Sequence, residues 1–135
     1  MTRVYVVVED GGTDVLGYHA INLGMMNVEE LAKRPRGAPD HGDLPILFLG
    51  QVAVSTPVQG TGLGSVLMHH VFAKAETIAN EAGCFAIVLD VMSDGDHAAY
   101  QRRQEWYAAF GFQSFVSQPS RMFMTMKQVR QLLRS

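Results

Sequence analysis

The first half of the chain alternates apolar runs with clusters of turn-forming residues. A valine-rich segment, 3–9, and a second apolar segment, 15–23, flank Asp10-Gly11-Gly12. Because glycine supplies the positive φ of a tight turn, this arrangement predicts a β-hairpin. The near-continuous apolar runs 46–54 and 85–91 are typical of strands at the centre of a sheet, where both faces of a strand are buried.

Two further segments carry apolar residues at steps of three and four positions and predict amphipathic helices. They cover residues 62–82 and 97–110, and the glycine that follows each of them, Gly83 or Gly111, suits a helix C-terminal cap. The first helix connects the two central strands and predicts a β-α-β unit. Together with the hairpin, this order of elements predicts an α/β fold with a mixed sheet.

The segment 24–45 differs in character, because it is rich in proline, glycine and charged residues. It predicts a loop with at most a short helix at residues 28–33, and a loop this long is usually functional or mobile. Near the C-terminus, residues 112–116 predict a short strand. Residues 121–127 alternate cleanly, with methionines at every second position, and predict a final strand.

Length and composition are those of one globular domain. The chain has 135 residues and a mass of 14.9 kDa, so we expect a single domain spanning residues 1–135. With 47% hydrophobic and 18% charged residues it can bury a core, which excludes disordered, collagen-like and coiled-coil proteins. A net charge of −2 gives no global attraction to nucleic acid or anionic membrane.

Cysteine content and the N-terminal sequence bear on the compartment. Cys84 is the single cysteine, which excludes an internal disulfide and a cysteine-rich metal site. The apolar run near the start is too short for a membrane span and lacks the form of a signal peptide. We therefore expect a cytoplasmic protein with no membrane partner and no metal cofactor.

A glycine-rich sequence, Gln59-Gly60-Thr61-Gly62-Leu63-Gly64, lies between a predicted buried strand and the first predicted helix. Glycines let the backbone approach a bulky anion, and the free N–H groups at a helix start point toward it. This position predicts a phosphate-bearing ligand. The spacing matches neither the dinucleotide-binding nor the Walker motif, and a turn that only reverses the chain is the alternative.

Three motifs in order resemble those of the GNAT superfamily of acyl-CoA-dependent N-acetyltransferases. They are LGQVAV at 49–54, the Q-x-x-G-x-G loop, and WYAAFGF at 106–112. The resemblance implies a GNAT-like, mostly antiparallel sheet flanked by helices, and acetyl-CoA as cosubstrate. It implies that the coenzyme pyrophosphate lies against Gln59, Gly60, Thr61, Gly62, Leu63, Gly64 and Ser65. It implies that Val52, Ala53 and Val54 bind the pantetheine arm and that Tyr107 protonates the leaving thiolate.

Within this superfamily the chain is most similar to the GNAT toxins of toxin–antitoxin pairs. The similarity rests on Gly17-Tyr18, the proline-rich connection and the motif at 49–54, in which Gln51 stands where a basic residue is usual. It implies that the acceptor is the amino group of aminoacyl-tRNA and that an antitoxin is a partner. The resemblance begins at the family's second strand, so we expect an N-terminally shortened member that lacks the usual N-terminal helices.

Acyl transfer needs a neutral amine, a polarised thioester carbonyl and a proton for the thiolate. Tyr107 can donate to the sulfur, although its position also suits a core aromatic residue. The strand 46–54 offers no acidic general base. Deprotonating a lysine-like amine at pH 7 costs about 4.6 kcal/mol, against about 1 kcal/mol for an α-amino group, so we expect an acceptor amine of low pKa.

Several polar residues have two open interpretations. One interpretation is that a general base or a proton relay is provided by Asp90, Asp94, Asp96 or His97. The other is that these residues form a polar loop that caps the next helix. Arg103 could bind a phosphate or an acidic substrate, or pack its stem on the helix and extend its charge into water.

Other residues are expected to be structural. We predict that His69 and His70 are solvated, and that Trp106 is a core or dimer contact. The methionines of the last strand, Met122, Met124 and Met126, are expected to fill the core or the contact of a homodimer. An alternative to catalysis is a shortened family member that binds acyl-CoA or dimerises without transferring an acyl group.

Overall fold

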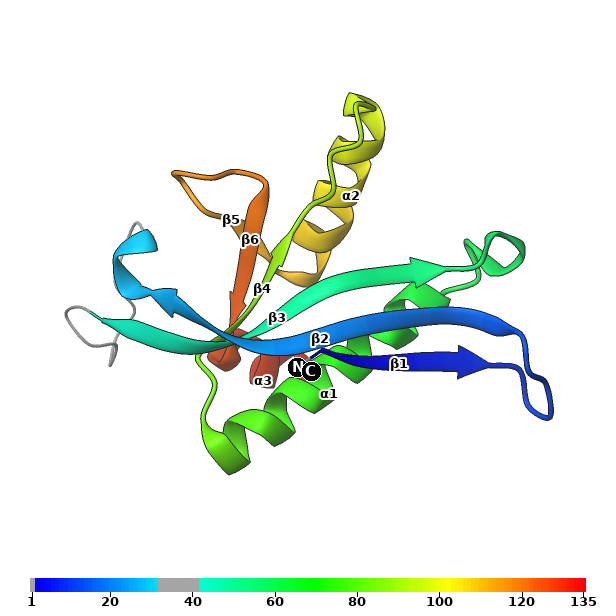
Figure 1. Ribbon diagram of the computed structural model, residues 1–135, viewed down its shortest axis with the longest axis horizontal. Coiled ribbons are helices and arrows are strands. Elements are labelled where there is room, and N and C mark those ends of the chain that lie inside the picture. Colours follow the sequence, from blue (N-terminus) through cyan, green and yellow to red (C-terminus); the bar gives the residue numbers. More distant parts are fainter. Residues whose placement is uncertain (1, 32–41) are drawn as a thin grey trace.

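Six strands form one mixed sheet in the computed structural model, which describes residues 2–31 and 42–135. The strands are β1 (Arg3–Val8), β2 (Val15–Asn27), β3 (Asp43–Val54), β4 (Ala86–Asp90), β5 (Gln113–Ser114) and β6 (Arg121–Thr125). The α-helices are α1 (Leu63–Ala82), α2 (His97–Phe110) and α3 (Met126–Leu133), with short 3₁₀ turns at Val28–Glu30 and Thr56–Val58. The strand order is β1-β2-β3-β4-β6-β5, and β3–β4 is the parallel pair among antiparallel ones (Figure 1), which confirms the predicted fold class.

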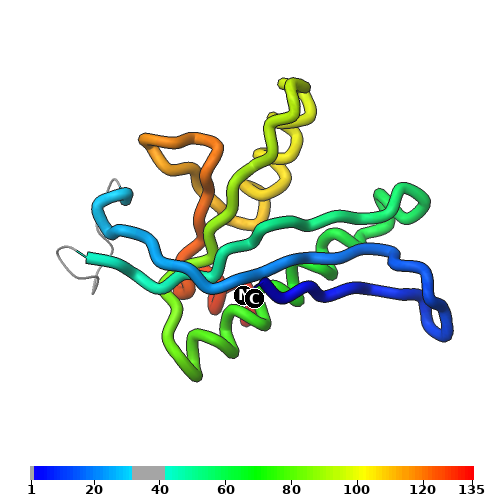
Figure 2. Tube along the Cα trace, in the orientation of Figure 1, coloured from blue at the N-terminus to red at the C-terminus, as the bar shows by residue number. Residues whose placement is uncertain are grey.

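Helix α1 makes the parallel pairing of β3 and β4 possible, because it returns the chain from the end of β3 to the start of β4 (Figure 2). Its apolar face lies on the sheet, where the side chains of Leu67, Met68, Val71, Phe72 and Ala75 are buried. Glycines in positive-φ conformations flank it, Gly62 with φ 90° and Gly83 with φ 87°. The predicted β-α-β unit is therefore confirmed.

Strands β3 and β4 pair over only part of their length. The paired residues are Ile46–Leu49 on β3 and Ala86–Leu89 on β4. Beyond them, a β-bulge places Gly50 as an extra residue on β3, since Ile21 faces Leu49 and Ala20 faces Gln51. A bulge bends and twists its strand. The two strands consequently diverge, with β3 continuing along β2 while β4 leads toward α2 (Figure 1).

Three strands and one helix differ from the sequence-based prediction. β2 runs on to Asn27 and β3 starts at Asp43, so both ends of the predicted loop 24–45 are strand; residues 32–41 lie outside the described residues. The predicted strand 112–116 shrinks to two residues, β5. The chain after Thr125 forms the helix α3 instead of extending the last strand.

The methionines of the predicted last strand are core residues, and the third of them stands at the start of α3. Met122, Met124 and Met126 expose only 2%, 1% and 3% of their surface, and β6 lies between β4 and β5. They cannot form the contact of a homodimer, so that part of the prediction was wrong.

Among the helices that the structure describes, none combines the length and apolar character that a bilayer crossing requires.

A histidine pair is built into the layer between the sheet and α1. His19 on β2 is fully buried, and its Nε2 lies 2.7 Å from Nδ1 of His70 on α1. The rings of both histidines pack against Tyr5, at 5.1 and 4.9 Å between centroids. His70 itself is exposed, as predicted, like His69, and its hydrogen bond to His19 was not predicted from the sequence.

The buried histidine predicts acid sensitivity. Burial, the neighbouring His70 and the Lys74 charge lower the pKa of His19 from 6.5 to about 4. In the unfolded chain His19 takes up a proton near pH 6.5, whereas the folded chain resists it until about pH 4, so stability falls as the pH drops through this window. We expect a loss of about 2 kcal/mol in unfolding free energy between pH 7 and 5, measured by urea denaturation. His19→Phe should remove most of this loss, whereas His69→Gln should retain it.

Candidate active site

The glycine-rich segment forms an open turn at the start of α1. Gly60 and Gly62 have φ values of 82° and 90°, which side-chain-bearing residues rarely adopt, and a Cβ on either would meet no atom within 4 Å. The N-cap Gly62 provides no side-chain cap, and within the described residues the N–H groups of Leu63, Gly64 and Ser65 have no acceptor. These N–H groups and the positive end of the helix dipole suit a phosphate.

Two side chains shape this turn. The Gln59 Nε2 donates to the carbonyl oxygen of Val54 at 3.0 Å, which ties the turn to the end of β3. The Thr61 hydroxyl donates to the carbonyl of Val58. A cavity of about 270 Å³ opens here, lined by Val54, Gln59, Gly60, Gly62, Gly64, Ser65 and Trp106. The turn thus holds together most of the residues that the sequence assigned to the pyrophosphate.

A second cavity continues from the first into the gap between β3 and α2. It has a volume of about 480 Å³ and is lined by Val52, Val54, Gln59, Gly64, Ala99, Arg102, Arg103, Trp106 and Tyr107. Because the two cavities share four lining residues, they form one continuous groove, which we call the coenzyme groove. The free edge of β3 borders it, since residues 51–54 pair with β2 and, within the described residues, with no strand on the other side.

Trp106 forms a wall of the coenzyme groove. A Cβ at position 64 would lie 3.1 Å from Cζ2 of Trp106, so a glycine is needed for this close approach. The indole is 36% exposed and meets the rings of Tyr107 and Phe110 edge-on, both at 5.0 Å between centroids. Trp106 was expected to be a core or dimer contact, and its place in the groove was not predicted from the sequence.

A third cavity lies at the far end of the coenzyme groove. Its volume is about 240 Å³, and its lining residues are Tyr18, Gly50, Gln51, Val52, Ala53, Asp90, Met92, Arg103 and Tyr107. Successive side chains of a strand point to opposite faces, so Gln51 and Ala53 face away from the side that Val52 and Val54 border. We call this cavity the acceptor pocket. Val52, Arg103 and Tyr107 line both the groove and the pocket, which places Tyr107 where the two meet.

The Tyr107 hydroxyl is suited to donate a hydrogen bond. Burial raises the pKa of Tyr107, and the charge of nearby Arg103 opposes this only in part. The phenol is therefore neutral at physiological pH. Within the described residues no group accepts a hydrogen bond from this hydroxyl, so it is available to a ligand atom at the junction of the groove and the pocket.

The polar residues at the end of β4 and in the loop after it are engaged in structural pairs. Asp90 binds Arg121 through two hydrogen bonds of 2.8 and 3.1 Å. Arg103 donates to the Met92 carbonyl at 3.1 Å and to Asp94 at 3.3 Å, which lowers the pKa of the Asp94 carboxyl. A carboxylate held by a cation is a weak base. The guanidinium of Arg103 is therefore anchored within the chain, and neither interpretation offered for it describes its contacts.

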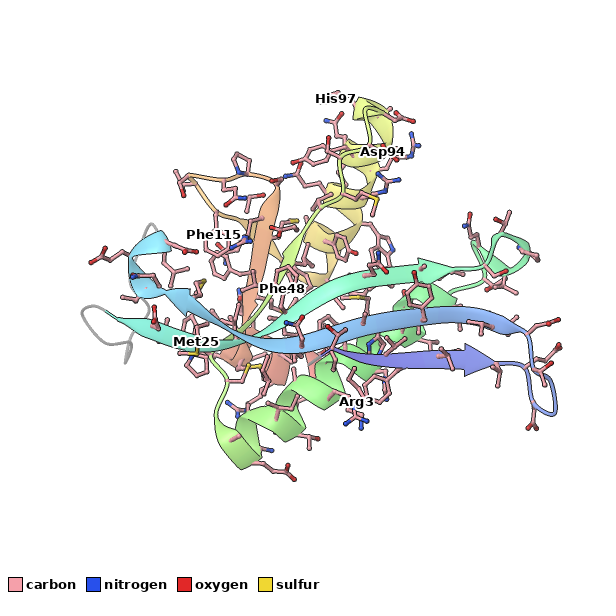
Figure 3. All side chains as sticks on the ribbon, in the orientation of Figure 1. Arg3, Met25, Phe48, Asp94, His97 and Phe115 are labelled. Carbon is pink, nitrogen blue, oxygen red and sulfur yellow. The ribbon has the colours of Figure 1, made fainter. Side chains whose placement is uncertain are left out.

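The remaining candidates lie at the outer end of α2. Asp96 accepts a hydrogen bond from the N–H of Ala99 at 3.0 Å and so caps the helix. His97 stacks on Tyr100 at 6.4 Å between centroids, and Figure 3 shows Asp94 and His97 at the tip of the helix, away from the sheet. These contacts favour the interpretation as a capping loop. In the described part of the chain no three His, Cys, Asp or Glu side chains are grouped as metal ligands.

Comparison with curated proteins shows clear relatives. A probable toxin TacT from Sinorhizobium fredii (strain NBRC 101917 / NGR234) is 34% identical over 132 residues, which cover 97% of this chain and 73% of the relative. A tRNA-acetylating toxin from Mycobacterium tuberculosis (strain ATCC 25618 / H37Rv) is 27% identical over 133 residues, covering 98% of this chain and 74% of the relative.

Solved structures share the fold. AtaT complexed with acetyl-methionyl-tRNAfMet has a TM-score of 0.81 at 19% identity, over 97% of this chain and 75% of that one. An AtaT mutant toxin bound to the C-terminus of the antitoxin AtaR and acetyl-CoA has a TM-score of 0.69 at 19% identity, over 90% and 65% of the two chains. Residues 2–114 match the acetyltransferase (GNAT) domain family. This match spans more than half of the chain and shows that the chain belongs to the GNAT family of acetyltransferases.

Proposed function

We propose that this acetyltransferase moves the acetyl group of acetyl-CoA to the α-amino group of an aminoacyl-tRNA. The observation that carries the proposal is the continuous passage from the glycine turn, past Tyr107, to the acceptor pocket. One curated relative is a tRNA-acetylating toxin, and one similar solved structure is AtaT complexed with acetyl-methionyl-tRNAfMet. Both support the choice of acceptor for this chain.

The donor would lie along the coenzyme groove. The open N–H groups at the start of α1 would bind the pyrophosphate, with Gln59 to Ser65 forming the cradle. The free edge of β3 at Val52, Ala53 and Val54 would pair with the amide groups of the pantetheine arm, as an added strand does. This arrangement would bring the thioester to the junction beside Tyr107.

The amine nitrogen would attack the thioester carbonyl carbon from the acceptor pocket, and the carbon–sulfur bond would break as the amide forms. The neutral Tyr107 hydroxyl would donate a hydrogen bond to the departing sulfur. The carboxylates described near the pocket, Asp90 and Asp94, are both paired with arginine. The amine must therefore lose its proton easily, which favours an α-amino group over a lysine-like amine.

Acetyl-CoA is expected to raise the melting temperature of the protein. A ligand at one hundred times its dissociation constant adds about 2.7 kcal/mol to the stability of the native state, which a thermal scan detects as a shift of several degrees. Transfer of radiolabelled acetyl groups to charged tRNA, with uncharged tRNA as control, then tests the acceptor. The proposal fails if millimolar acetyl-CoA gives no shift, or if charged tRNA takes up no label.

We also propose the partner, the compartment and the oligomeric state of the enzyme. The toxins among its relatives, and the AtaT–antitoxin complex, support an antitoxin partner in the cytoplasm. A homodimer is supported by the exposed Val4, Val6 and Val8, which lie on one face of β1 and offer apolar surface to a second copy. Residues 1–135 would form one domain in each copy.

A further inference from the structure

Two polar side chains on the floor of the acceptor pocket form a fixed pair. Tyr18 on β2 donates its hydroxyl hydrogen to Oε1 of Gln51 on β3, at 3.1 Å. The strands are neighbours in the sheet, and Tyr18 pairs with Ala53, two residues along β3 from Gln51. Both side chains line the pocket that also contains Tyr107. The pair therefore has a defined geometry before any acceptor arrives.

This contact decides which end of the Gln51 amide is available. An amide has one oxygen acceptor and two N–H donors. The oxygen is held on the Tyr18 side by this hydrogen bond, whereas the amide N–H groups have no acceptor within the described residues and are available to a ligand. Gln51 thus presents hydrogen-bond donors without a positive charge.

The cations beside the pocket are already engaged. Arg103 binds the Met92 carbonyl and Asp94, and Arg121 binds Asp90 through two hydrogen bonds. A carboxylate in the pocket would gain no free cation, and an acceptor without a carbonyl would offer the Gln51 N–H groups no acceptor atom beside its amine. A neutral carbonyl oxygen is the ligand atom that fits a neutral donor in this setting.

We infer that Gln51, held in place by Tyr18, donates a hydrogen bond to the carbonyl oxygen next to the acceptor amine, and so selects α-aminoacyl esters and amides over simple alkylamines. The inference rests on the proposed function, because it assumes that an amine acceptor enters this pocket. Gln51 is a specificity-determining residue in this scheme, and Tyr18 is a positioning residue. An adjacent carbonyl also lowers the pKa of the amine. The acceptors that Gln51 would select are therefore also those that lose their proton easily, as the reaction requires.

Three acceptors distinguish the effect of the carbonyl on the rate from the effect of the rest of the substrate. Methionyl-tRNA carries the ester, methionine amide carries an amide in its place, and 3-(methylthio)propylamine has the same side chain with no carbonyl. Values of kcat/KM are compared after correction for the fraction of neutral amine. We expect the wild-type protein to favour methionine amide over 3-(methylthio)propylamine, and Gln51→Leu to reduce this ratio about tenfold, as for one lost hydrogen bond.

Two further variants isolate the role of the donor. Gln51→Glu can still accept the hydrogen bond from Tyr18 but has no N–H to donate, so it should lose the preference as Gln51→Leu does. Tyr18→Phe should reduce it about threefold, by releasing the Gln51 amide. Asn22→Leu removes an amide from β2 at a residue outside the pocket and should leave the ratio unchanged.

The outcomes separate the inference from the proposed function. If no acceptor is acetylated by the wild-type protein, the proposed function fails and the inference fails with it. If acceptors are acetylated but Gln51→Leu and Gln51→Glu keep the wild-type ratio, the inference alone is wrong. Comparison of methionyl-tRNA with methionine amide then shows whether the ester of tRNA adds to the preference that the carbonyl provides.

Discussion

Replacement of Gly62 by glutamate is expected to abolish coenzyme binding. Gly62 caps α1 at the point where the open N–H groups begin, and a Cβ there points into free space, where the pyrophosphate would lie. A glutamate would add a negative charge to that space. Hydrogen bonds to charged partners contribute about 1.5 to 3 kcal/mol each, so losing two of them weakens binding by more than a hundredfold. Isothermal titration with acetyl-CoA measures the loss.

Backbone strain needs its own control, because residue 62 has φ 90° and any side chain there is strained. Gly83 provides one: it has φ 87°, its Cβ would also meet no atom within 4 Å, and it lies at the opposite end of the same helix. Gly83→Glu should lose stability to a similar degree yet bind acetyl-CoA normally. Normal binding by a folded Gly62→Glu protein would contradict the assignment of this turn to the pyrophosphate.

The sequence predicts those elements whose first and last residues are recognisable as capping residues. Helix α2 spans His97–Phe110 as predicted, because Asp96 caps its start and Gly111 ends it in the left-handed conformation. Helix α3 was missed although Thr125 and Gln128 form a capping box. The alternation of methionines runs on into the first helical residue, so the strand pattern obscured the cap. A cap motif is therefore as informative as the periodicity beside it.

The sequence predicted individual residues of the site but not the arrangement of the strands that forms its cavities. The positive-φ glycines and the groove position of Tyr107 agree with the motifs that suggested them, and their roles remain predictions. The divergence of β3 from β4 depends on a bulge at Gly50, which nothing in the local sequence distinguishes from an ordinary strand glycine. His19 is a similar case, because its burial depends on α1 lying against that part of β2.

Tyr107→Phe is expected to reduce acetyl transfer about a hundredfold while leaving acetyl-CoA affinity nearly unchanged. The ring packs edge-on against Trp106 and Phe112, at 5.0 and 5.9 Å, and phenylalanine preserves both contacts. Only the hydroxyl at the junction of groove and pocket is lost. If it donates to the sulfur in the transition state, its removal lowers kcat and spares binding. Steady-state kinetics and acetyl-CoA titration separate the two effects.

The pH profile and a matched variant make this prediction specific. Because burial raises the pKa of Tyr107, its ionisation should not reduce the rate at any pH below about 10. Tyr100 lies earlier on the same helix, stacks on His97 and is not among the groove-lining residues. Tyr100→Phe should keep the wild-type rate, since Tyr100 lines neither the coenzyme groove nor the acceptor pocket. Equal rates for wild-type and Tyr107→Phe proteins would show that Tyr107 only packs, and that the departing thiolate obtains its proton from water or from the amine itself.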